Sequence, residues 1–136
     1  FLFSAAKAWR FRPKFPKIER RPKTKPLTLR DKKLKERWEE LMRKVDYESV
    51  ESLKATILDA DKLVNEVLKR LGLEGQHMGE RIELISEDDY ASLSALWTAH
   101  RFRNNIVNTP GFEVAPEEAK EAIEGYHAFL KEIGVL

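Results

Sequence analysis

The segment WTAHRFRNNIVN, residues 97–108, has the pattern of the second half of an amphipathic helix. Together with Tyr90 and Leu93 upstream, its apolar positions recur every three or four residues, which is the period of a helix with one buried face. The segment also carries one His, two Arg and three Asn. A helix that only closes a core has no need of so many hydrogen-bonding groups. The segment therefore indicates a helical fold and the first place to look for a binding site.

The same apolar spacing recurs in three other long segments, each bounded by residues that commonly cap helices. No segment shows the alternating pattern of a strand. The sequence therefore predicts an all-α fold, a bundle of four main helices in which Tyr126 is a core residue of the last helix. The predicted boundaries are Thr28 (with Asp31 as a capping-box partner) to about Val45; Ser49 or Asp46 to Gly72; Ser86 (with Asp89) to Asn108; and Pro116 to Gly134, with a short helical turn over 78–84.

Composition limits the class of protein. A chain of 136 residues holds at most one domain and a tail. It has no Cys, which excludes disulfides and Cys-based zinc sites and fits a reducing compartment. The three His, at positions 77, 100 and 127, do not have metal-ligand spacing. The sequence therefore indicates no metal site and no cofactor.

Charge divides the chain into two parts. Residues 1–44 carry 16 Lys and Arg against 5 Asp and Glu, a net charge of +11, whereas residues 45–136 carry 9 against 18, a net charge of −9. Four prolines among the basic residues of 10–28 favour an extended backbone. We therefore expect residues 1–27 to form a basic, Pro-rich arm or juxtamembrane linker, and residues 28–136 to form the helical bundle domain. A basic arm on an acidic domain favours a polyanionic partner.

Two polyanions suit this arm. An anionic membrane surface is favoured by the apolar residues 1–6, which are the expected remnant of a transmembrane helix, and it would place the protein at the cytoplasmic side of a membrane. RNA, including ribosomal RNA, is favoured by aromatic residues that can stack on bases, and it fits a cytoplasmic location. The arm residues expected to contact either partner are Lys7, Trp9, Arg10, Arg12, Lys14, Lys17, Arg20, Arg21, Lys23 and Lys25.

Three short segments follow one another in an order that resembles a known superfamily. They are Ala60-Asp61, then GQHMGER at residues 75–81, then WTAHRFRN at residues 97–104. From residue 54 to 136 the chain resembles the HEPN superfamily of helical domains. It is more closely similar to a group of membrane-anchored proteins from candidate-phyla bacteria with small genomes. On this basis the HEPN-like core is expected to span residues 49–136.

The resemblance implies an α-helical domain that is often dimeric, with the Arg and His of an Arg-x4-6-His signature facing a shared cleft. In active members this cleft is a metal-independent ribonuclease site. Arg103 corresponds to the Arg and Asn104 to its polar neighbour, but Asn108 stands where the signature has His. An amide cannot exchange a proton near neutral pH as an imidazole can, so the site is expected to bind without cutting. His100 is a substitute base that shares a helix face with Arg103.

The polar residues of this region have both structural and functional interpretations. Asp61 lies on the apolar face of its helix and is expected to meet Arg103 or His100 across the bundle. There it is either an ion pair that fixes helix register or a group that orients the Arg at a ligand cleft. His100 is either a satisfied core residue or a ligand-binding or catalytic group. Arg103 and Asn104, extended by Arg101, suit phosphate or base recognition or, alternatively, capping of the helix C-terminus.

The predicted function is a non-catalytic HEPN-like interaction module at the membrane face, and the resemblance to bacterial proteins implies that this is the cytoplasmic side of the bacterial inner membrane. It would bind a nucleotide, RNA or a protein partner, and it could form a homodimer through the bundle. The alternatives are a metal-independent ribonuclease, and an RNA- or ribosome-binding protein that uses the arm. The candidate catalytic residues are Arg103 and His100. The candidate ligand-binding residues are Asp61, His100, Arg101, Arg103, Asn104 and Asn108.

Overall fold

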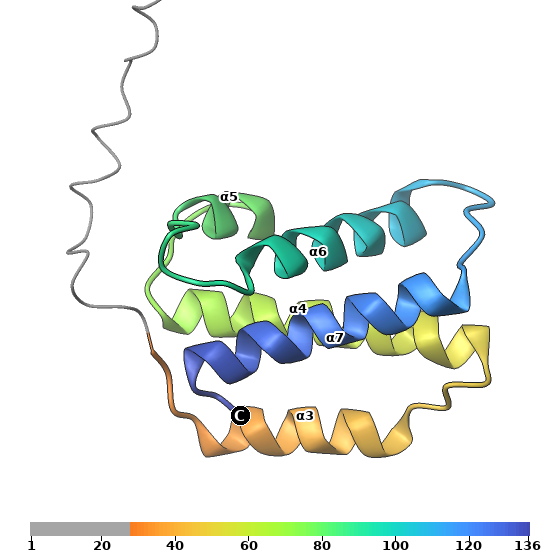
Figure 1. Ribbon diagram of the computed structural model, residues 1–136, viewed down its shortest axis with the longest axis horizontal. Coiled ribbons are helices and arrows are strands. Elements are labelled where there is room, and N and C mark those ends of the chain that lie inside the picture. The colour runs from red at the N-terminus through yellow and green to blue at the C-terminus, as the bar shows by residue number, and fades with distance from the viewer. Residues whose placement is uncertain (1–27) are drawn as a thin grey trace, which may run out of the picture.

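Five α-helices and no strand make up residues 28–136, the part of the chain that the computed structural model describes (Figure 1). The all-α fold class is therefore confirmed. The arm residues from Lys7 to Lys25 and the apolar segment 1–6 lie outside the described residues, so their contacts stay predictions. The helices are α3 (Lys32–Lys44), α4 (Val50–Arg70), α5 (Met78–Glu83), α6 (Leu93–Asn108) and α7 (Pro116–Ile133).

Short polar side chains begin the first two long helices. The predicted start of α3 at Thr28 is wrong, because Asp31 is itself the N-cap and accepts two backbone N–H groups of the first turn at 3.0 and 3.1 Å. Leu29, the next residue after Thr28, instead contacts the end of α7, where its N–H donates to the carbonyl of Ile133 at 3.1 Å. Ser49 caps α4 as predicted.

The predicted start of α6 at Ser86 with Asp89 is also wrong, since the helix begins after Ser92. The carbonyl of Ser86 instead closes a turn by accepting the N–H of Asp89 at 3.1 Å. The carboxylate of Glu132, in α7, accepts hydrogen bonds from the N–H of Ala91 at 3.0 Å and from the N–H and hydroxyl of Ser92 at 2.9 and 2.6 Å. It thus holds the two residues immediately before α6 from 40 residues away in the sequence.

The predicted ends of α4 and α7 are confirmed. Gly72 follows α4 with φ +88°, and Gly134 caps α7 with φ +106°, a left-handed conformation that favours glycine. The N–H of Gly134 donates to the carbonyl of Leu130 at 3.2 Å, which satisfies one of the last carbonyls of the helix. Pro116 occupies the first turn of α7, where the missing N–H costs no hydrogen bond.

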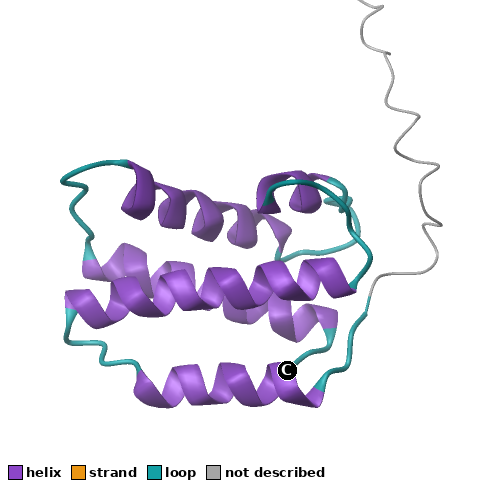
Figure 2. Ribbon diagram, turned by 180° about the vertical axis from the view of Figure 1, so that it is seen from behind, coloured by secondary structure: helices purple, strands orange, loops and turns teal. Residues whose placement is uncertain are grey.

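The α4–α7 pair forms the middle of the domain, with α3 on one side and α6 on the other (Figures 1 and 2). The short helix α5 packs beside α4 and α6. None of these helices is both long and apolar enough to cross a membrane. Each of the four longer helices contributes to the core; the largest fully buried side chains include Leu34 (α3), Leu53 and Ile57 (α4), Leu93 and Leu96 (α6), and Tyr126 and Phe129 (α7).

The α6–α7 contact depends on a glycine. Gly125 lies in the buried face of α7, and a Cβ atom there would lie 2.7 Å from the carbonyl oxygen of Ala95 in α6. The two backbones therefore approach each other closely at this point. In the last turn of α6 it is Ile106 that packs against the core, and Val107, expected on the buried stripe, is 50% exposed.

Candidate functional site

Asp61 is a buried carboxylate at which three helices meet. It belongs to α4 and is only 5% exposed. Its Oδ1 accepts a hydrogen bond from the hydroxyl of Tyr126 (α7) at 2.7 Å and lies 3.0 Å from Nδ1 of His100 (α6). Its Oδ2 lies 3.5 Å from Nε of Arg103 (α6). Burial of a carboxylate is costly without such partners, so this cluster also fixes how α4, α6 and α7 pack.

His100 and Arg103 reach Asp61 together because they lie three residues apart on one face of α6. The structure thus places both expected partners of Asp61 against it. The Nδ1 atom of His100 faces a carboxylate, which can only accept, so Nδ1 carries the proton of this contact. This tautomer leaves Nε2 as the nitrogen that can accept a proton from a ligand.

Tyr126 is a member of the site that the sequence identified only as a core residue. Its side chain is fully buried, and its hydroxyl also lies 3.3 Å from the carbonyl oxygen of Ala99. Burial, followed by the charge of Asp61, raises the pKa of the Tyr126 hydroxyl far above its ordinary value. The hydroxyl therefore remains a neutral donor to the carboxylate. The position of Tyr126 in the apolar pattern of its helix gives no signal that its hydroxyl binds Asp61.

A polar pocket of about 410 Å³ opens beside this cluster, between α4, the 75–78 region with α5, and α6. Three of its lining residues are cationic, two are imidazoles and four are side-chain amides, whereas Asp61 is its one carboxylate and Met78 its one apolar residue. The cations are Lys69, Arg81 and Arg103; the imidazoles are His77 and His100; the amides are Asn65, Gln76, Asn104 and Asn108.

Arg81 is the second residue that sequence reasoning missed. It is 9% exposed, and its terminal nitrogens donate to Asn65 Oδ1 at 3.1 Å and to the carbonyl of Gly75 at 2.7 Å. Its Nε has no hydrogen-bond partner within residues 28–136. The sequence signal for its burial is its position, since Arg81 lies three residues after Met78 and one before Ile82, two apolar residues that are buried in the structure.

Most of the predicted ligand-binding residues line this pocket. They are Asp61, His100, Arg103, Asn104 and Asn108, and Asn104 also accepts a hydrogen bond from Arg103 at 2.9 Å. Arg101 is the exception. Its guanidinium lies 5.5 Å from the centroid of the Trp97 ring, a cation–π contact at the exposed side of α6, and it is not a lining residue.

Family models, curated proteins and solved structures all give no match to the chain. No group of three or more His, Cys, Asp or Glu side chains that could hold a metal ion occurs in the described part of the chain. What the pocket does must therefore be argued from its own side chains.

Proposed function

We propose that the chain is a non-catalytic, HEPN-like bundle of four main helices that binds a nucleotide or RNA in the pocket lined by Asp61, His100 and Arg103. One observation carries this proposal: three cationic side chains line the pocket, and its one carboxylate is already occupied by Tyr126, His100 and Arg103. Guanidinium, ammonium and amide groups are the donors that bind phosphate oxygens in proteins. A protein partner is the less favoured ligand, because the lining offers one apolar residue.

The absence of catalysis is proposed from Asn108. Its side chain lines the pocket at the position where the resembled signature has the His that exchanges protons. An amide can orient a phosphate by hydrogen bonding, but it has no protonation equilibrium near neutral pH. The proposed site therefore holds its ligand without cleaving it.

The test is the affinity of the full chain for a short labelled RNA, measured by fluorescence anisotropy. Arg103→Ala is expected to weaken binding by about tenfold or more, the loss that follows removal of a charge-assisted contact. Asn108→Asp, an isosteric change at an exposed residue, should weaken it as well, because it adds a negative charge to the pocket.

Arg101→Ala is the matched control, since it removes the same charge from the same helix outside the pocket. It should change the affinity far less than Arg103→Ala. Equal losses in the two arginine variants would mean that RNA binds through general charge and not through the pocket.

A metal-independent ribonuclease is the second candidate, and the 3.0 Å contact between Asp61 and His100 Nδ1 favours it. A carboxylate that fixes the imidazole tautomer is an arrangement found in general bases. Turnover of labelled RNA in a chelating buffer that is lost in both His100→Gln and Arg103→Ala, and kept in the exposed-residue control His127→Gln, would support it. Asn108→His restores the signature, so the non-catalytic proposal expects cleavage to appear only in that variant.

The arm at residues 1–26 is the basis for a further proposed contact, with an anionic membrane surface at the cytoplasmic face or with RNA. The charge division of the sequence supports it. Co-sedimentation with anionic and with uncharged vesicles, for the full chain and for a chain that lacks residues 1–26, separates these cases. Binding to anionic vesicles that survives the deletion would contradict the membrane contact, and salt-sensitive binding to RNA without vesicle binding would select RNA.

A further inference from the structure

The charge of Arg81 is the feature of the pocket that most requires an explanation. Its side chain is nine-tenths buried, yet its two hydrogen bonds go to neutral acceptors, Asn65 Oδ1 and the carbonyl of Gly75. It makes no ion pair with any carboxylate in residues 28–136, and its Nε has no hydrogen-bond partner there. Buried charges in proteins are normally paired. An anion in the pocket would supply the missing partner.

The net charge of the lining indicates how much negative charge this anion carries. Lys69, Arg81 and Arg103 contribute three positive charges and Asp61 one negative charge, which leaves an excess of two with neutral imidazoles. A phosphodiester within a strand carries one negative charge and two unesterified oxygens. A terminal phosphate carries close to two charges near neutral pH and three unesterified oxygens. The lining therefore complements a terminal phosphate better than an internal one.

The polarity of the lining indicates which part of the ligand is recognised. Proteins that bind bases without pairing commonly stack them on aromatic side chains. The lining contains no Phe, Tyr or Trp, and Met78 is its one apolar residue. The pocket lining therefore has no large aromatic side chain on which a nucleobase could stack.

We propose that this pocket binds a terminal phosphate, a phosphomonoester dianion, between Arg81 and Arg103, with the base of the nucleotide left outside. This inference rests on the proposed function and narrows its ligand. The phosphate can come from a free nucleotide or from the end of an RNA strand, because the pocket would contact the same group in both. Lys69, at the exposed rim of the pocket, attracts the phosphate by its charge but does not fix its position.

The experiment compares ligands that differ only in that group. Calorimetric titration of the full chain uses inorganic phosphate, AMP and adenosine, and then one RNA sequence with a 5′-phosphate, with a 3′-phosphate or with two hydroxyl ends. We expect AMP to bind and adenosine not to bind. A phosphorylated end should tighten RNA binding by about tenfold. Changing the base of the mononucleotide should alter the affinity by less than about threefold, because the base makes no stacking contact.

Variants assign the effect to the pocket. Arg81→Gln and Lys69→Ala should each reduce the preference for a phosphorylated end, whereas Arg101→Ala should keep it. Arg81 is buried, so Arg81→Gln could fail to fold. Lys69 is exposed, so Lys69→Ala tests the attraction of the lining for the dianion without that risk. A rise in the melting temperature of the wild type with added phosphate, at constant ionic strength, is an independent measure of binding.

The outcomes separate this inference from the proposed function. If RNA with a terminal phosphate and RNA with two hydroxyl ends bind equally, and Arg103→Ala still abolishes binding, the pocket binds nucleic acid and the terminal-phosphate inference is wrong. If no phosphate compound or RNA shows binding that depends on Arg103, both are wrong. If affinity follows the base, so that adenosine binds as well as AMP, the ligand is recognised by its base and the inference is also wrong.

Discussion

The hydroxyl of Tyr126 connects the core of the domain to the proposed site. It donates to the buried carboxylate of Asp61 at 2.7 Å, and its raised pKa keeps it protonated. The other two contacts of Asp61 come from groups that face the pocket, His100 and Arg103. Tyr126 is thus the one partner of Asp61 that a ligand cannot engage, and it holds the carboxylate in place whether or not a ligand is bound.

We therefore expect Tyr126→Phe to destabilise the fold by about 1.5–3 kcal/mol, the usual contribution of a hydrogen bond to a charged group. The measurement is urea unfolding followed by circular dichroism. Tyr47→Phe is the matched control, because Tyr47 is 43% exposed and its hydroxyl contacts only Met42 Sδ, at 4.0 Å, among the described residues. Equal stability of the two variants would mean that the hydrogen bond to Asp61 makes no net contribution.

At the residue scale the sequence predicts the contacts among Asp61, His100 and Arg103, and it misses the parts played by Tyr126 and Arg81. The spacing of His100 and Arg103 predicts that they lie together, and the position of Asp61 on an apolar face predicts its burial. Tyr126 and Arg81 look like ordinary members of a core stripe and of a short turn. Their roles depend on what lies opposite them, and one sequence does not contain that information.

At the element scale, α6 depends on a carboxylate from another helix. Glu132 of α7 accepts three hydrogen bonds from Ala91 and Ser92, so it fixes the chain immediately before α6, a helix whose N-cap residue makes no side-chain capping bond. Glu132→Ala should cost about 1 kcal/mol in urea unfolding, the typical net contribution of an intramolecular hydrogen bond. Glu124→Ala, at an exposed position of the same helix, is the control and should have little effect.

The same contact predicts a pH dependence. Burial alone would raise the pKa of Glu132, but the hydrogen bonds from Ser92 and Ala91 outweigh it, so the pKa lies below its ordinary value of 4.5. A carboxyl with a lowered pKa stabilises the fold above its ordinary pKa, and the contribution is lost as pH falls through that value and below. The stability difference between wild type and Glu132→Ala should therefore shrink in acid. A stability difference that stays constant down to about pH 3 would mean that the charged carboxylate of Glu132 does not stabilise the fold through these hydrogen bonds.

The α6–α7 contact gives a second prediction at this scale. Gly125→Ala gains about 1 kcal/mol of helix propensity, but its Cβ would lie 2.7 Å from the carbonyl oxygen of Ala95, an atom that cannot rotate away. We expect a net loss of about 1–2 kcal/mol from this overpacking, measured as a shift of the urea midpoint. Gly79→Ala is the control, because its Cβ would make an ordinary contact with the Trp97 ring at 3.7 Å. It should leave stability unchanged or raise it.

Element boundaries follow from sequence where the cap is local. Ser49, one of the two caps expected for α4, accepts an N–H of the first turn, Pro116 lies in the first turn of α7, and Gly134 caps its end, so these boundaries are predicted correctly. The predicted start of α6 is wrong because the contact that holds the residues before this helix comes from Glu132 of α7. The predicted start of α3 is wrong because Asp31, expected as the capping-box partner of Thr28, is itself the N-cap.

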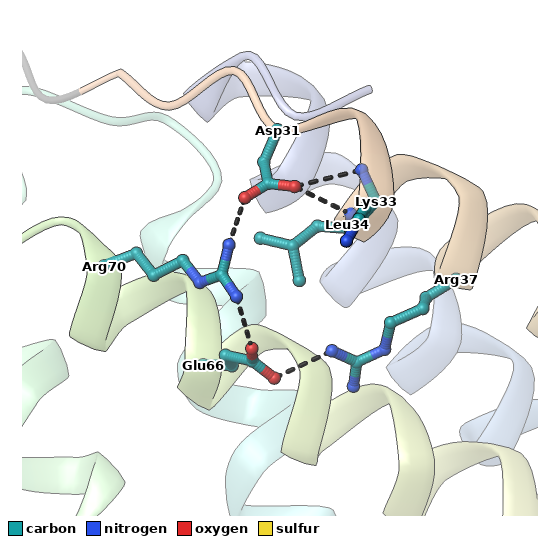
Figure 3. Close-up of polar contacts among 6 residues, drawn as sticks. All are labelled: Asp31, Lys33, Leu34, Arg37, Glu66 and Arg70. Carbon is teal, nitrogen blue, oxygen red and sulfur yellow. Dashed lines mark hydrogen bonds and ion pairs between the residues drawn. The ribbon is translucent and has the colours of Figure 1, made fainter.

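At the scale of the whole molecule, α3 is the helix most dependent on charged contacts. Its main packing partner among the helices is α4, and the two are joined by a chain of side chains in which Arg70 contacts Asp31 and Glu66, and Arg37 contacts Glu66 at 2.7 Å (Figure 3). Leu34 and Trp38 are the buried residues of α3, and the centroid of a Trp38 ring lies 6.0 Å from that of His127 in α7. The pocket lies on the other side of α4, toward α5 and α6, so loosening of α3 is expected to affect stability before binding.

This chain of charges gives the last prediction, the response of the whole domain to acid. The backbone N–H of Leu34 and the charge of Arg70 hold the pKa of Asp31 below its ordinary 3.8, and Arg37 and Arg70 hold the pKa of Glu66 below its ordinary 4.5. Both carboxyls therefore stabilise the fold above these values, and the contribution is lost as pH falls through them.

Arg70→Gln should lower the urea midpoint at neutral pH, whereas Lys62→Gln, which removes the same charge from the exposed face of α4, should change it less. The wild-type and Arg70→Gln midpoints should converge toward about pH 3, and added salt should bring them together at neutral pH because all of these side chains are at least partly exposed. A gap that persists unchanged in acid would mean that Arg70 does not act through these carboxylates. The absence of a gap at neutral pH would mean that packing of Leu34 and Trp38 alone attaches α3.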